Sequence, residues 1–305
     1  MKKVSSDKHM ILVTGAAGKT GQAVLKALTR REASVHAVVH RPEQIKIIEN
    51  FDVDDITVGD LRDPKAMRRA AQGTQAIYHI CPNVNLYEVE IGQVMIETAI
   101  IAGTDHFVYH SVLHPQVESM PHHWKKMHVE ALLFESKMKW TILQPTIYMQ
   151  NMLGYMDSII SDGVYPVPYN INSQFSMVDL DDVANAAALI LTNSGHTGAI
   201  YELVGTMPMS SVKIASAISR KLGIQVEAIE ISLTRWEQNA RASGLSDYQL
   251  SALIKMFEYY DKYGMTGSTN VLSYLLSRQP TTFNDFLEQL KEKQIQSYKN
   301  RFGSN

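Results

Sequence analysis

The stretch "VTGAAGKTG", residues 13–21, decides the fold of this chain. It follows the apolar run "MILV" and precedes the helix-like run "QAVLKALTRR", after which a second apolar run, "SVHAVVH", begins. These are the proportions of one βαβ unit with parallel strands, and the glycines let a pyrophosphate approach the amino terminus of the helix. The cofactor-binding residues predicted in this turn are Gly15, Gly18, Lys19, Thr20 and Gly21.

The same stretch also resembles a phosphate-binding Walker loop, through its Gly-Lys-Thr letters. A Walker loop needs four residues between its first glycine and Gly-Lys-[Ser/Thr]. Here only Ala16 and Ala17 separate Gly15 from Gly18, so the spacing disfavours an ATPase.

The alternation of apolar runs and helices continues through four further predicted strands, "ITVGDL", "AIYHICP", "HFVYHSV" and "WTILQP", and resumes at "AIYELVG". Asp63 and Pro64 are expected to cap and open one of the intervening helices. We therefore predict an α/β fold, a doubly wound parallel (Rossmann) sheet with a smaller, mostly helical carboxy-terminal lobe. The expected Rossmann domain comprises residues 9–155 and 174–204, and the substrate or partner lobe comprises residues 156–173 and 205–305.

Composition excludes several classes of protein. The 29 Lys and Arg against 31 Asp and Glu give a formal charge of −2, so nucleic acid is not expected as a direct partner. No apolar run approaches the roughly 20 residues of a membrane helix, and no signal peptide is expected. The single cysteine, Cys81, cannot form an internal disulfide, which favours a reducing, cytoplasmic location.

The second predicted strand ends in "VVHRP", where His40 and Arg41 stand in the place of the acid that reads NAD ribose. Cations there would bind a 2′-phosphate, so NADP(H) is the preferred cofactor and NAD(H) the alternative. Arg41 could instead begin an exposed helix. Asp60, at the end of the next strand, suits the adenine amino group, or is an ordinary turn residue.

The segments "ILVTGAAGKTG", "VVHRP", "GDLRD", "KMHVEALLFESKMKWTILQPTIYMQN" and "DLDDVANAA" occur in this order. Together they resemble the NmrA-like branch of the atypical short-chain dehydrogenases/reductases. The resemblance covers nearly the whole chain, and residues 126–151 are its most specific part. It implies a Rossmann domain that binds NADP(H) or NAD(H). The family mixes quinone and dye reductases and isoflavone-reductase relatives with dinucleotide sensors that regulate transcription without catalysis.

The resemblance also implies roles for individual residues. It assigns the glycine turn to the pyrophosphate, Arg41 to the 2′-phosphate, Asp60 with Leu61 to adenine, Lys126 to the family lysine, and Pro145 with Tyr148 to the nicotinamide. Two positions depart from the family. Gln144 stands where arginine often precedes the proline, and His122 stands where typical short-chain reductases have tyrosine, which this branch commonly lacks.

The cluster "PHHWKKMHVE", residues 121–130, contains the catalytic candidates. His122 and Lys126 are one helical turn apart. Lys126 would hold the nicotinamide ribose, and His122 would donate a proton, unless the two simply begin a solvated helix. The histidine spacing lacks the pattern of a zinc site, so no metal is expected, and His123, Lys125 and His128 are expected to be solvated.

Two further candidates follow predicted strands. Ser111, flanked by His110 and His114, takes the place of the catalytic serine of short-chain reductases, or else caps a turn. Cys81 would lie close to the cofactor, or else be a small buried thiol.

These features predict an NADP(H)-dependent oxidoreductase that transfers hydride to a small apolar or aromatic acceptor, such as a quinone, enone or dye. The alternative is a non-catalytic NAD(P)(H)-binding redox sensor that regulates transcription through a protein partner. We expect a monomer or a homodimer.

Overall fold

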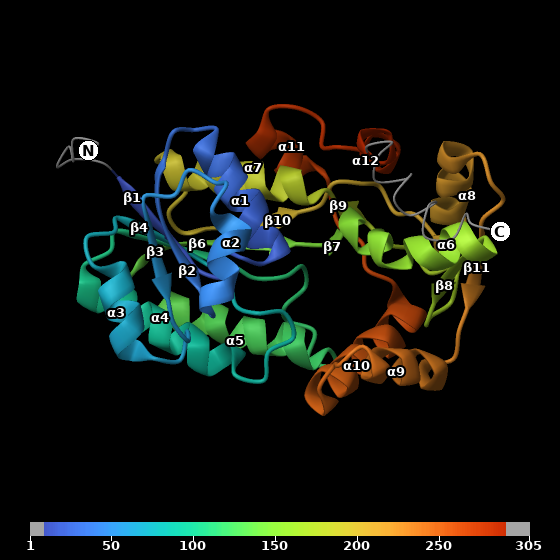
Figure 1. Ribbon diagram of the computed structural model, residues 1–305, viewed down its shortest axis with the longest axis horizontal. Coiled ribbons are helices and arrows are strands. Elements are labelled where there is room, and N and C mark those ends of the chain that lie inside the picture. The colour runs from blue at the N-terminus through green and yellow to red at the C-terminus, as the bar shows by residue number, and fades with distance from the viewer. Residues whose placement is uncertain (1–8, 291–305) are drawn as a thin grey trace. The chain divides into compact units, whose positions relative to one another are not determined.

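The computed structural model describes residues 9–290. They form two compact units, each built from separate stretches of the chain (Figure 1). The first unit contains residues 9–117, 122–144 and 183–201, and the second contains residues 118–121, 145–182 and 202–290.

A seven-stranded sheet, in the order β10-β6-β5-β4-β1-β2-β3, is the centre of the first unit. Its strands are β1 (Met10–Val13), β2 (Ser34–Val39), β3 (Asp55–Val58), β4 (Ala76–His79), β5 (His106–His110), β6 (Lys139–Pro145) and β10 (Ala199–Leu203). Pairing is parallel from β3 through to β6. The amide of Gly198 donates to Trp140 and that of Thr146 to Leu203, so β10 also runs parallel to β6. The predicted doubly wound parallel sheet is confirmed.

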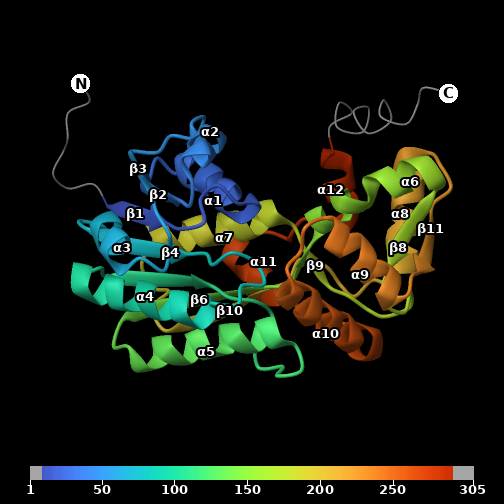
Figure 2. The ribbon, with the colours of Figure 1, turned by 60° about the horizontal axis from the view of Figure 1, so that its bottom comes forward.

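Helices cover both faces of this sheet (Figure 2). One face packs against α3 (Pro64–Ala71), α4 (Glu88–Ala102) and α5 (Pro121–Glu135), through a core that includes Met67, Met95 and Leu133. On the other face lie α1 (Lys19–Thr29) and α7 (Leu180–Thr192), while η1 (Pro42–Gln44) and α2 (Ile45–Ile48) follow β2. Asp63 accepts hydrogen bonds from the amides of Lys65 and Ala66, so the predicted start of α3 is confirmed.

The second unit contains two short parallel strand pairs, β7 (Ile147–Tyr148) with β9 (Met177–Val178) and β8 (Val164–Val167) with β11 (Glu227–Glu230). Its helices are η2 (Met149–Tyr155), α6 (Met156–Asp162), α8 (Ser211–Leu222), α9 (Leu233–Ala242), α10 (Asp247–Tyr263), α11 (Asn270–Leu276) and α12 (Phe283–Gln289). Its apolar core includes Met149, Met156, Ile218 and Phe286. Across residues 9–290, no helix combines the length and apolar character needed to cross a membrane.

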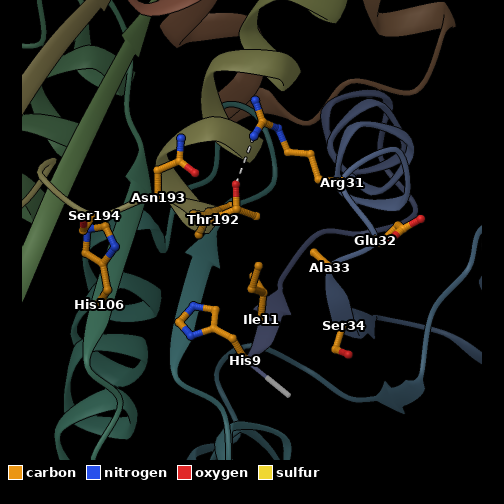
Figure 3. Close-up of a pocket in the computed structure, with 11 residues that line it drawn as sticks. His9, Ile11, Arg31, Glu32, Ala33, Ser34, His106, Thr192, Asn193 and Ser194 are labelled. Atoms are coloured by element: carbon orange, nitrogen blue, oxygen red, sulfur yellow. Dashed lines mark hydrogen bonds between the residues drawn. The ribbon is translucent and has the colours of Figure 1, made fainter. Parts of the chain in front are cut away.

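A cavity of about 480 Å³ lies at the amino edge of the sheet in the first unit (Figure 3). Residues from the starts of β1, β2 and β5 and from the ends of α1 and α7 line it, and Arg31 donates to Thr192 Oγ1 over 3.3 Å in its wall. The cofactor and catalytic candidates named from the sequence are not among its lining residues. The glycine turn, Arg41, Asp60, Cys81 and Ser111 instead follow the carboxyl ends of strands, at the opposite edge of the sheet.

Candidate functional site at the carboxyl edge of the sheet

The glycine turn between β1 and α1 has the geometry of an anion-binding turn. Gly15 has φ of 61°, in the left-handed region that favours glycine. A Cβ at Gly21 would lie 2.3 Å from the carbonyl oxygen of Gly15, so helix and turn approach closely only because position 21 has no side chain. Gly18 caps α1 without a side-chain hydrogen bond, which leaves the first-turn amides for an anion. These residues therefore fit a pyrophosphate.

Hydrogen bonds hold the turn to the neighbouring strands. Thr14 donates its amide to the carbonyl of Tyr78 over 3.1 Å, and its hydroxyl accepts from the amide of Ile80 over 2.8 Å. The amide of Ala16 donates to Val38 in β2 over 3.2 Å. The turn is thus fixed to both β2 and β4 before any ligand binds.

His40 and Arg41 are exposed and directly follow β2. Oε1 of Gln44 accepts the amides of both residues, over 2.9 and 3.1 Å, and Arg41 caps η1. Arg41 therefore does begin a short exposed helix, and its fixed backbone leaves its guanidinium in solvent at the end of β2.

The carboxylate of Asp60 is bound by Arg62, whose Nη2 and Nε atoms lie 2.9 and 3.3 Å from its oxygens. This hydrogen bonding, with the charge of Arg62, holds the pKa of Asp60 below its usual value. Leu61 is buried in the core beneath α3. An adenine amino group at Asp60 would therefore share this carboxylate with Arg62.

Lys126 on α5 forms a buried ion pair with Glu88, the first residue of α4. Its Nζ atom lies 3.0 Å from Glu88 Oε1, and the two side chains are 11% and 3% exposed. Tyr109 donates its hydroxyl to the same Glu88 oxygen over 2.8 Å, and Lys126 also donates to the carbonyl of His110 over 3.2 Å. Burial opposes ionisation of Glu88, but the charge and hydrogen bond of Lys126 outweigh it and hold the pKa of Glu88 below its usual value.

Cys81 follows β4 in the same region and is a free, buried thiol within the core. Burial, reinforced by the neighbouring charge of Glu88, raises its pKa well above the usual value. The thiol is therefore protonated and unreactive near neutral pH.

Ser111, directly after β5, belongs to a second buried polar group. Its hydroxyl donates to Oε1 of Glu130 on α5, and Gln144 on β6 donates to both oxygens of the same carboxyl, over 2.9 and 3.1 Å. Burial raises the pKa of Glu130, and the hydrogen bonds from Ser111 and Gln144 oppose this only partly. Gln144, the departure from the family pattern, thus acts as a neutral partner of Glu130.

His122 is buried one turn before Lys126, and its Nδ1 atom has no hydrogen-bond partner among the described residues. Burial, and then the charge of Lys126, lowers its pKa to about 4. The imidazole is therefore neutral near pH 7, with a buried nitrogen left for a ligand. Within residues 9–290, no three or more His, Cys, Asp and Glu side chains gather to hold a metal ion.

The prediction that His123 is solvated is wrong. Its side chain is buried, edge-on to His122 with 4.6 Å between ring centroids, and its Nδ1 approaches the carbonyl of His114 at 3.4 Å. The loop after β5 covers this face of α5, and the sequence pattern gave no sign of it. Lys125 is half-buried, whereas His128 is exposed and packs against Trp124.

The structure thus brings together the glycine turn, Cys81, Ser111, His122 and Lys126 at the carboxyl edge of one sheet. Pro145 ends β6 and Tyr148 lies in β7, and both belong to the second unit. Sequence reasoning missed Glu88, Tyr109 and Glu130. Glu130 closes the motif K-x-x-V-E one turn after Lys126, which was the available signal, whereas Glu88 and Tyr109 gave none.

Known proteins resemble this chain over almost its full length. It is 26% identical to an NAD(P)H azoreductase of Xenophilus azovorans, over 91% of this chain and 96% of that protein. It is 25% identical to quinone oxidoreductase 2 of Escherichia coli, over 92% and 98%.

Solved structures share the fold. The E. coli quinone oxidoreductase in complex with NADPH superposes with a TM-score of 0.82 at 23% identity, over 92% of this chain and 99% of that one. NmrA, a negative transcriptional regulator, gives 0.77 at 17%, over 98% and 99%. The profile of the NmrA-like family matches residues 7–287. This chain therefore belongs to the NmrA-like family.

Proposed function

We propose that this protein is an NAD(P)H-dependent reductase, with NADP(H) preferred, that transfers hydride to a small apolar or aromatic acceptor such as a quinone, enone or dye. The observation that carries the proposal is the bond from Lys126 Nζ to the carbonyl of His110, at 3.2 Å. It places an ammonium beside Ser111 at the edge where this fold binds dinucleotides. The similarity of this chain to an NAD(P)H azoreductase and a quinone oxidoreductase supports the same class of reaction.

When bound, the reduced nicotinamide would supply the hydride. The residues of this chain then have separate tasks. The Gly15–Gly21 turn and the amino end of α1 would bind the pyrophosphate, and Arg41 would bind the 2′-phosphate. The Lys126 ammonium would stabilise negative charge that develops on the acceptor oxygen.

Proton delivery falls to Ser111 and His122. With its pKa at about 4, His122 would donate from a neutral ring N–H rather than as an imidazolium. Ser111 would donate from its hydroxyl, whose bond to Glu130 fixes its position.

Turnover with purified protein tests the proposal. NADPH or NADH is mixed with quinones, azo and triphenylmethane dyes and enones, and loss of the reduced nicotinamide absorbance is followed. We expect at least one acceptor to be reduced, faster with NADPH than with NADH. If the protein binds the cofactor but reduces none of the acceptors, the proposed reductase function is rejected.

One observation favours the alternative, a redox sensor that acts through a protein partner. The charge of Lys126 is already neutralised by Glu88, which weakens its use in catalysis. A sensor would bind the oxidised and reduced cofactors with clearly different affinity and turn over neither. Calorimetric titration with both forms, beside the turnover assay, separates the two functions.

A further inference from the structure

Two carboxyl groups lie near Lys126, and the protein treats them differently. Glu88 accepts hydrogen bonds from the Lys126 ammonium at 3.0 Å and from the Tyr109 hydroxyl at 2.8 Å. Glu130 is one turn further along α5 and only 2% exposed, yet the hydrogen bonds it receives come from the uncharged side chains of Ser111 and Gln144. One acid therefore has a cation in contact, whereas the bonding partners of the other are neutral.

The charged surroundings of Glu130 are sparse. On its own helix, Lys126 is the nearby cation, and its Nζ atom is engaged by Glu88. On β5, the phenol of Tyr109 is the titratable neighbour, and it too donates to Glu88. The partners from β6 and from the loop after β5, Gln144 and Ser111, carry no charge. Environments that shift the pKa values of two acids in opposite directions keep one acid ionised and the other protonated.

The bond between Ser111 and Glu130 makes the hydroxyl depend on the carboxyl. A serine hydroxyl has one proton to donate and two lone pairs to accept. If Glu130 is ionised, it takes that proton as a hydrogen bond and Ser111 has none to give elsewhere. If Glu130 is protonated, it donates to Oγ, and the proton of Ser111 is then available to an acceptor.

We propose that Glu130 is the proton reserve of Ser111, so that a buried carboxyl supplies the proton that a tyrosine supplies in other short-chain reductases. The inference rests on the proposed reductase function. Glu130 acts through Ser111 and touches no substrate, so it is a positioning residue.

The step balances in atoms and charge. When bound, the reduced nicotinamide would supply hydride to the β carbon of a quinone or enone; the C=C π pair would then form the enolate C=C bond, and the C=O π pair would move to the acceptor oxygen. The Ser111 hydroxyl proton passes to that oxygen, and the Glu130 carboxyl proton passes to Ser111 Oγ. The products are the reduced acceptor, the oxidised nicotinamide and an ionised Glu130, which takes a proton from water before the next turnover.

The test combines kinetics with a measurement that needs no cofactor. The kcat of the wild type is expected to fall as pH rises and Glu130 loses its proton. In Glu130→Gln, kcat should fall to about a tenth of the wild-type value or lower, with KM retained and this pH dependence gone. Ser111→Ala should behave alike, and the double variant should be no slower than either single one. Glu135→Gln, on an exposed position of the same helix, is the matched control.

The independent measurement is a ¹³C NMR titration of the glutamate side chains in cofactor-free protein, with Glu130 assigned by its absence in Glu130→Gln. A pKa above the ordinary glutamate value supports the proposal, and an ordinary or lower one overturns it. If Glu130→Gln does not fold, the pH profile of Ser111→Ala decides: loss of the pH dependence of kcat supports the reserve. An unchanged profile in an active variant overturns this role alone, whereas no turnover of any acceptor by the wild type overturns the reductase with it.

Discussion

Lys126 Nζ lies 3.0 Å from Glu88 Oε1, and both side chains are almost wholly withdrawn from water. A buried charge that loses its partner is costly, roughly 3–5 kcal/mol. Glu88→Gln should therefore lower the free energy of unfolding by about that amount, measured in urea. The double variant with Lys126→Met should recover much of the loss, because it leaves no unpaired charge. Additive losses from Glu88→Gln and Lys126→Met would contradict the pairing.

The close backbone packing at Gly21 leads to a second prediction. Gly21→Ala would place a Cβ 2.3 Å from the Gly15 carbonyl oxygen and 2.6 Å from backbone atoms of Ala16, so the backbone must move. We expect a loss of about 2 kcal/mol or more in unfolding free energy and a large loss of cofactor affinity. Gly154→Ala, where a Cβ would meet no atom within 4 Å, is the control and should change neither quantity appreciably.

Arg41 is expected to discriminate between the two cofactors. Arg41→Ala should weaken NADP(H) binding by about 1.5–3 kcal/mol, the value of a hydrogen bond to a charged group, and hardly affect NAD(H). Calorimetric titration measures both affinities. Arg30→Ala, which changes an exposed arginine at the carboxyl end of α1, is the control. Equal losses of both cofactors would show that Arg41 does not read the 2′-phosphate.

His122 is expected to serve turnover and not cofactor binding. His122→Ala should reduce kcat about tenfold or more and leave the cofactor dissociation constant unchanged. Because burial lowers the pKa of His122 to about 4, its contribution should not vary between pH 6 and 8. His128→Ala changes an exposed histidine of the same helix and should keep the full rate. An unchanged kcat in His122→Ala would remove His122 from the mechanism.

The buried histidines should make the protein sensitive to acid. Burial lowers the pKa values of His79 and His122 to about 4, from 6.5. Between pH 6.5 and about 4 the unfolded chain therefore binds more protons than the folded one, and stability falls as pH falls. A shift of this size is worth roughly 3 kcal/mol per group, although the raised pKa of Glu130 opposes the trend.

Urea unfolding across this pH range measures the effect. His79→Asn keeps a neutral partner for Thr14, which now bonds His79 Nδ1 over 3.0 Å, but cannot titrate. The slope of its unfolding free energy against pH should be smaller than in the wild type, by the equivalent of up to one bound proton. The slope of His128→Gln should match the wild type. An equally steep slope in His79→Asn would show that His79 is not kept neutral by the fold.

The sheet and the glycine turn could be predicted because their signals are local. Apolar runs of strand length, a cap at Asp63 and glycine spacing act within a few residues of one another. The Glu88–Lys126 and Glu130–Gln144 contacts join residues far apart in the chain, and only the packing of α4, α5 and β6 brings them together.

The prediction that His123 is solvated failed for a related reason. A histidine in a polar stretch reads as solvated unless something covers it, and here the covering loop carries His114, nine positions earlier. Its course depends on tertiary packing that no periodicity in α5 records.

The order of the strands has a consequence during synthesis. β6 is paired with β5 on one side, but its other edge stays unpaired until β10 is made, after residues 145–182 of the second unit. Until then Trp140–Leu143, three of whose four residues are apolar, form an unpaired strand edge with which other chains can pair. Truncated products that stop at Gln144 should therefore aggregate, and newly made chains should depend on chaperones until Leu203 has emerged.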